Sequence, residues 1–133
     1  MPADVPLYED RTARDEAYRR AEREERPFLA VERYEEGYAV TYDLFPTGYE
    51  LSKPVTEELN ERLTRKVEDV VADAASRTAE VSKTVGPSLG SVSMFARERD
   101  AREVGALASR FVLDEANWVE ASPPDATDEY RRN

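Results

Sequence analysis

Cysteine and histidine are both absent from this chain of 133 residues. Without cysteine the protein has no disulfide framework, no thiolate nucleophile and no thiolate ligand for a metal ion. Without histidine it lacks the usual general base near neutral pH and the commonest protein metal ligand. An enzyme would have to use carboxylate, lysine, serine, threonine or tyrosine chemistry. No motif of that kind is present, so we assign no catalytic residue, metal site or cofactor.

Isoleucine and glutamine are absent as well, and arginine far outnumbers the three lysines, Lys53, Lys66 and Lys83. Acidic residues exceed basic ones by 29 to 19, which gives a formal net charge of -10. This composition is typical of GC-rich genomes, and the acidic surplus is typical of salt-accumulating halophiles, in which concentrated salt screens the repulsion between carboxylates. We interpret the protein as halophilic. An ordinary acidic protein from a GC-rich bacterium is the alternative.

Long apolar runs are missing too. No run approaches the roughly 18 residues of a membrane-spanning helix, and the first residues, MPADVPLYED, lack the cationic and apolar parts of a signal peptide. We therefore expect a cytoplasmic protein with no membrane contact. The negative net charge also repels nucleic acid unless part of the surface reverses it locally.

The length of the chain predicts one domain, and the periodicities along it predict the α+β class. Residues 9–26 are almost all charged and predict a peripheral helix stabilised by acid-before-base pairs four residues apart. These pairs are Asp15 with Arg19, Glu16 with Arg20, and Glu22 with Arg26. Residues 1–8 are expected to be a flexible N-terminus and residues 122–133 a disordered tail, with a single domain over 9–121.

Aromatic and β-branched residues over 28–52 predict a three-stranded antiparallel meander. A three-residue loop needs a positive φ only at Gly37, and it would pair Tyr34 with Tyr38 and Ala30 with Tyr42. Tyr34, Tyr38 and Tyr42 would then share one face, packed in the core or against a partner. A small-ligand pocket is an alternative. A surface that stacks bases is disfavoured because the neighbouring residues are acidic and not basic.

An apolar stripe over residues 55–85 predicts a long amphipathic helix. Its members recur at steps of three and four residues: Val55, Leu59, Leu63, Val67, Val70, Ala74, Thr78, Val81 and Val85. The pattern repeats every 11 residues, which keeps a helix nearly straight and does not match a heptad coiled coil. We expect this helix to pack across the sheet. A C-terminal helix over 95–113 is predicted to close the core, and residues 111–120 fit either helix or strand.

Residues 86–93, between these two helices, are rich in glycine and serine and are a candidate anion site. Backbone amides and hydroxyls before a helix, with arginine in its first turn, can cradle a phosphate. The candidate residues are Gly86, Ser88, Gly90, Ser91, Ser93 and Arg97. The segment has no Walker lysine and no dinucleotide-binding fingerprint, and a connector that breaks the helix explains the same residues.

Three strands and one long helix would leave a sheet edge and a sheet face uncovered, and a homodimer would cover both. We therefore interpret the protein as a non-enzymatic interaction or regulatory protein that binds a second copy of itself or another protein. The alternative is a nucleic-acid-associated protein that uses the arginines of residues 11–26 or 97–110. An anion-binding protein or enzyme built on residues 86–93 comes third.

The acidic surplus leads to a prediction about salt. The screening length falls from about 10 Å at 0.1 M salt to about 3 Å at 1 M, so salt weakens the repulsion between excess carboxylates. Raising KCl from about 0.1 M to about 2 M should increase the thermal midpoint by many degrees, as measured by circular dichroism. Another chloride salt at equal ionic strength should give much of the same gain. A midpoint that does not change with salt would contradict the halophile interpretation.

Overall fold

The computed structural model describes residues 5–34, 37–73, 82–94 and 97–121, whose centre is a five-stranded sheet of order β1-β2-β3-β6-β5. The strands are β1 (Leu7–Tyr8), β2 (Phe28–Tyr34), β3 (Gly37–Asp43), β5 (Ser82–Val85) and β6 (Leu89–Met94). Neighbouring strands are antiparallel except β1 and β2, which run parallel. The α+β class is confirmed. The three-stranded meander is wrong, because β1 extends the sheet at one edge and β6 and β5 extend it at the other.

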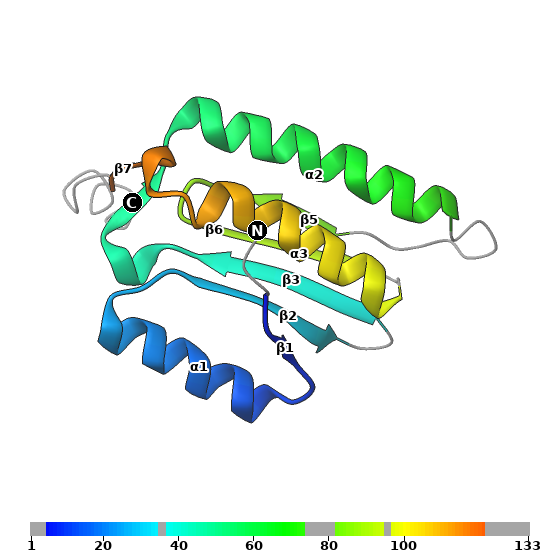
Figure 1. Ribbon diagram of the computed structural model, residues 1–133, viewed down its shortest axis with the longest axis horizontal. Helices are drawn as coiled ribbons and strands as arrows, with labels where there is room; N and C mark the ends of the chain where they lie inside the picture. Colours follow the sequence, from blue (N-terminus) through cyan, green and yellow to red (C-terminus); the bar gives the residue numbers. More distant parts are fainter. Residues whose placement is uncertain (1–4, 35–36, 74–81, 95–96, 122–133) are drawn as a thin grey trace, which may run out of the picture.

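In the described residues three helices pack on this sheet: α1 (Arg11–Glu24), α2 (Lys53–Asp73) and α3 (Glu98–Val112). α1 lies on one side of the sheet, and α2 and α3 lie on the other (Figure 1). The short elements are η1 (Phe45–Thr47), β4 (Tyr49–Leu51), η2 (Glu115–Asn117) and β7 (Trp118–Glu120). β4 and β7 pair in a separate two-stranded sheet. None of the described helices combines the length and apolar character needed to cross a membrane.

The larger core lies between the sheet and helices α2 and α3. α2 contributes four buried residues of the predicted stripe: Leu59, Leu63, Val67 and Val70. α3 contributes mostly small side chains: Ala101, Val104, Ala108 and Val112. These small residues let α3 approach the sheet closely, and a Cβ atom added at Gly105 would lie 3.0 Å from a methyl group of Val31. A larger residue at position 105 would therefore push α3 away from β2.

β2 and β3 pair one residue away from the predicted register. Tyr34 lies opposite Gly37, and Leu29 lies opposite Tyr42. Tyr34 therefore lies on the opposite face from Tyr38 and Tyr42, and the predicted single face with all three tyrosines is wrong. The observed register places Leu29, Val31 and Val40 with Tyr38 and Tyr42 under α2 and α3, and Phe28 on the face of α1. This burial outweighs the local turn preference on which the prediction rested.

The long helix does not reach residue 85. α2 spans Lys53–Asp73, residues 74–81 lie outside the described residues, and Ser82–Val85 form β5. The prediction is wrong at this end because Val85 fits the helical stripe by spacing alone. Thr84 and Val85 are β-branched, and β6 supplies the strand with which they pair.

The structure places both ends of the described chain in sheets. Val5 is buried and Leu7–Tyr8 pair with β2, so residues 5–8 do not belong to the flexible N-terminus that was predicted. Residues 1–4 and the predicted tail 122–133 lie outside the described residues. At the other end Trp118 begins β7, donates its indole N–H to the carbonyl of Val112 at 2.9 Å, and stacks on Tyr49 with ring centroids 5.7 Å apart.

Tyr42 holds the β5–β6 hairpin against β3. Its ring lies over Gly90, the residue opposite it on β6, and its hydroxyl donates a 2.6 Å hydrogen bond to the carbonyl of Gly86. A Cβ atom at position 90 would overlap the ring. Glycine is therefore required here by the close approach of an aromatic side chain.

We predict that Gly90→Ala destabilises the protein by about 2 kcal/mol, because the new methyl group forces the ring of Tyr42 to move. In a Tyr42→Leu background the ring is absent, so the same substitution should cost much less. Chemical denaturation of the wild type, both single variants and the double variant measures this coupling. Ser91→Ala, at the next position and on the other face, is the control. Additive effects of the two substitutions would contradict the ring contact.

Candidate functional site

A buried ion pair attaches α1 to the sheet. Nε of Arg14 donates to Oε2 of Glu32 at 2.9 Å, and only 18 % and 11 % of the two side chains are exposed. Arg11 approaches the other carboxylate oxygen of Glu32 at 3.3 Å. The guanidinium of Arg14 also lies 5.0 Å from the centroid of the Phe28 ring, which is a cation–π contact. Charge therefore positions this helix, whose own apolar side is thin.

A second polar contact joins α1 to β3. The hydroxyl of Tyr18 donates to Oδ2 of Asp43 at 2.8 Å, and Oδ1 accepts the backbone N–H of Phe45 at 2.8 Å. Burial, together with this hydrogen bond to a carboxylate, raises the pKa of Tyr18 to about 12, because both disfavour the tyrosinate. Asp43 and Glu32 are thus both engaged by partners within the chain, which is a structural role.

Among the described residues α1 packs mainly against β1, β2 and η1, and the residues of β6 and β5 on the same face of the sheet are exposed or half-buried. Four small hydroxyl residues form this open surface, which we call the hydroxyl face: Ser82, Thr84, Ser91 and Ser93. Ser82 and Thr84 are exposed, and the two serines of β6 are half-buried. Leu89, 47 % exposed, lies on the same face of β6. None of the four residues of the hydroxyl face carries a charge.

β5 is an outer strand of the sheet. The N–H of Gly86 donates to the carbonyl of Leu89 at 3.0 Å, which fixes these residues as a hydrogen-bonded pair. Alternation along an antiparallel ladder then directs the N–H and C=O groups of Lys83 and Val85 away from β6. In the described part of the chain no strand pairs with this outer side of β5.

Lys83 does not protect this edge, although an exposed lysine is a common way to block an edge strand. Its ammonium group lies on the helix side of the sheet, where it hydrogen-bonds to Asn60 at 2.9 Å and to the hydroxyl of Thr64. Sequence reasoning missed this edge because the helical spacing of Val81 and Val85 hid it. The signal available in the sequence was the pair of β-branched residues Thr84 and Val85 directly before Gly86 and Pro87, which is typical of a strand that ends in a turn.

The predicted anion site does not lie at a helix N-terminus, because Gly86, Ser88 and Gly90 belong to the β5–β6 hairpin. The carbonyls of Gly86 and Ser88 accept hydrogen bonds from the Tyr42 hydroxyl and the Leu44 amide. The expected position before a helix is therefore wrong, and anion binding by these residues stays a prediction.

The other members of that predicted site lie apart. Ser91 and Ser93 belong to the hydroxyl face, whereas Gly90 faces α2 and α3. Arg97 precedes the first turn of α3, and its Nε lies 3.5 Å from the carboxylate of Asp100. The structure thus brings only the two serines together on an open surface.

Two of the three predicted interface tyrosines lie in the chain's own core. Tyr38 and Tyr42 are 7 % and 2 % exposed, whereas Tyr34 is 47 % exposed on the opposite face. The hydroxyl of Tyr38 accepts a 2.9 Å hydrogen bond from Arg33, whose guanidinium lies over its ring. Tyr34 alone of the three is accessible to a partner.

The arginines considered for nucleic-acid binding are interleaved with carboxylates. On α3, Arg99 and Arg102 lie 3.9 Å and 3.0 Å from Glu103 and Glu98. On α1, Arg11 and Arg14 contact Glu32, as described above. This arrangement gives both helices mixed charge, whereas binding to phosphates requires a concentration of basic groups.

Among the described residues, no group of three or more acidic side chains is placed to hold a metal ion. No protein-family model matches the chain, and comparisons with curated proteins and with solved structures give no match. The outer side of β5 and the adjoining hydroxyl face are the open surface that the geometry of the chain itself supports best.

The tyrosine contacts predict a loss of stability at alkaline pH. The pKa of Tyr18 is raised to about 12 and burial raises the pKa of Tyr42 further, so the folded state keeps protons that the unfolded chain releases near pH 10. The contribution of these tyrosines to the free energy of unfolding should therefore be level below about pH 9 and fall as the pH rises through about 10 to 12. Urea denaturation followed by circular dichroism measures this profile.

Tyr18→Phe is the matched variant for this experiment, because it removes the phenol and keeps the ring that packs on Phe28. The alkaline loss should be shallower in this variant than in the wild type. Parallel profiles for the two proteins would show that the hydroxyl of Tyr18 is not held by Asp43.

Proposed function

We propose that the protein is a non-enzymatic interaction protein that forms a homodimer through the outer edge of β5. The observation that carries this proposal is the pair of outward-facing backbone positions, Lys83 and Val85, on an edge strand beside the uncharged hydroxyl face. An unpaired strand edge is a template for another strand, and a second copy of the chain offers an edge of the same length and pattern.

In a dimer with a two-fold axis through Thr84, the outward N–H and C=O groups of Lys83 and Val85 would pair with those of the second copy. Lys83 of one copy would lie opposite Val85 of the other, and each such pair would exchange both of its N–H···O=C hydrogen bonds. The two Thr84 residues would face each other at a position without backbone hydrogen bonds, with Cα atoms roughly 4.5 Å apart. Threonine pairs across strands are favourable. The two sheets would then form one continuous sheet, with the hydroxyl faces side by side.

The chemistry of the chain is consistent with a binding role. Histidine and cysteine are absent, and the buried carboxylates Glu32 and Asp43 are held by Arg14, Tyr18 and the backbone. Two chains of net charge -10 repel each other, and concentrated salt would screen this repulsion. A cytoplasm rich in salt, as proposed from the composition, would therefore favour the dimer.

Sedimentation equilibrium at micromolar concentrations in about 1 M KCl, where the screening length is about 3 Å, tests the dimer. We expect a mass twice the 15.1 kDa of the chain. Val85→Pro removes an outward N–H that no strand within the described chain uses, and it should give a folded monomer. Val85→Ala, which keeps the N–H and loses side-chain packing, should remain dimeric. A wild-type monomer, or a dimeric proline variant, would rule out this interface.

Cross-linking locates the axis independently. Because the chain has no cysteine, Thr84→Cys introduces a single thiol, and facing thiols at Thr84 would lie within disulfide distance. We expect mild oxidation to convert this variant to a covalent dimer. Glu16→Cys, at an exposed position of α1 on another part of the surface, is the control. Equal cross-linking of both variants would indicate random collisions and contradict the proposed axis.

A further inference from the structure

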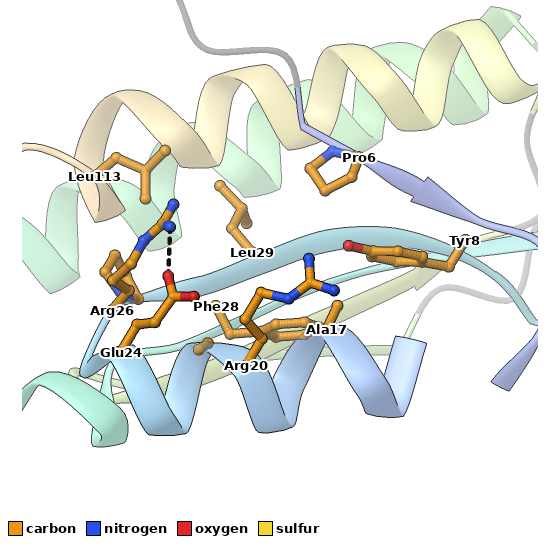
Figure 2. A pocket seen from close by; sticks show the side chains of 11 residues that line it. Pro6, Tyr8, Ala17, Arg20, Glu24, Arg26, Phe28, Leu29 and Leu113 are labelled. Carbon is orange, nitrogen blue, oxygen red and sulfur yellow. Dashed lines mark hydrogen bonds and ion pairs between the residues drawn. The ribbon is translucent and has the colours of Figure 1, made fainter. Parts of the chain in front are cut away.

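A cleft lies between α1, β1, the start of β2 and the end of α3 (Figure 2). Its volume is about 300 Å³, which is at the lower end of the range for small-molecule sites, roughly 300–1,000 Å³. The chain creates one wall where α1 ends, because Glu25 adopts a left-handed conformation with φ 53° and the backbone reverses into Pro27 and β2. The cleft and the outer side of β5 belong to different parts of the fold, so this site does not depend on the proposed dimer.

The lining of the cleft combines polar and apolar surface and includes two aromatic rings. Phe28 and Tyr8 contribute the rings, and Pro6, Pro27 and Leu113 contribute aliphatic surface. Figure 2 shows the side chain of Leu113 projecting from the end of α3 toward the cleft, opposite α1. A small ring or a branched aliphatic group could pack against these apolar side chains.

Three charged residues line the same cleft, and one of them has no counter-charge. Glu24 and Arg26 form an ion pair at 2.8 Å. The side chain of Arg20 makes no ion pair or hydrogen bond with any described residue, so the pair with Glu16 that its spacing predicted is not formed. Figure 2 shows the guanidinium of Arg20 and the hydroxyl of Tyr8 directed toward the same part of the cleft.

We infer that this cleft binds a small carboxylic acid with an aromatic or branched apolar body. The apolar body would lie against Phe28, Pro27 and Leu113, and the carboxylate would face Arg20. The planar guanidinium matches a carboxylate with two parallel hydrogen bonds, and the Tyr8 hydroxyl can donate a further one. A multiply charged phosphate ester fits less well, because the cleft offers one uncompensated cation beside apolar surface.

The test uses phenylacetate and its neutral isostere phenylacetamide as probes, with the methyl NMR signals of Ala17, Leu29 and Leu113 as the readout. These methyl groups line the cleft. We expect phenylacetate to shift all three signals with a dissociation constant on the order of 1 mM, typical of a fragment-sized ligand. Phenylacetamide should bind about tenfold more weakly, because it lacks the charge that pairs with Arg20.

Arg20→Gln and Arg19→Gln form a matched pair of variants. Both positions are exposed on α1, but only Arg20 lines the cleft. Arg20→Gln should weaken phenylacetate binding about tenfold and leave phenylacetamide binding unchanged, whereas Arg19→Gln should change neither. Ala17→Leu, which fills part of the cleft, should weaken both probes.

Four results would overturn the inference. The first is the absence of shifts at these methyl groups at tens of millimolar phenylacetate, well above the expected dissociation constant of about 1 mM. The second is equal binding of the acid and the amide, and the third is an equal effect of the two arginine variants. Inorganic phosphate that shifts the same signals and competes with phenylacetate would also overturn it, since the cleft would then bind anions without regard to the apolar body.

Discussion

The alignment of β2 with β3 is the constraint on which the other contacts depend. All seven residues of β3 are buried, so the side chains on each face of this strand need partners of matching polarity in the helix that covers that face. In the observed register one face turns Tyr38 and Tyr42 toward α2 and α3, and the other turns Glu32 and Asp43 toward α1. A shift of one strand by one residue would move its apolar side chains under the charged helix and its carboxylate into the core. One alignment therefore sets both the core and the position of α1.

The contacts between α1 and the sheet fix the position of the helix but contribute little net stability. The apolar cluster beneath the helix is small, with Ala21, Phe28 and Ala30 as its buried members. The attraction within the pair of Arg14 and Glu32 is largely offset by the cost of removing both charges from water. The pair therefore determines where the helix lies. The pair acts on the N-terminal half of α1, and the cleft lies beside the C-terminal half.

The sequence predicted the elements that carry a long local signal, and it missed those that form by pairing with distant strands. The stripe from Leu59 to Val70 is helical because four consecutive members support one period. β6 carries serines and Gly90 between its apolar residues and resembles a loop until β3 and the ring of Tyr42 lie beside it. The outer edge of β5 was missed for a related reason, because it depends on how this strand pairs with β6. The outward direction of Lys83 and Val85 is a property of the ladder, and no property of single residues reveals it.

The junction of β4 and β7 gives the protein an optical property. Trp118 is the single tryptophan of the chain. Its fluorescence therefore reports on one region, where the end of α3 meets the start of α2. Its fluorescence depends on the stacked ring of Tyr49 and on the hydrogen bond to Val112. Far-ultraviolet dichroism instead averages over all helices and strands. Melting curves from the two signals coincide if the junction opens with the whole fold, and they separate if it opens first as a local unit.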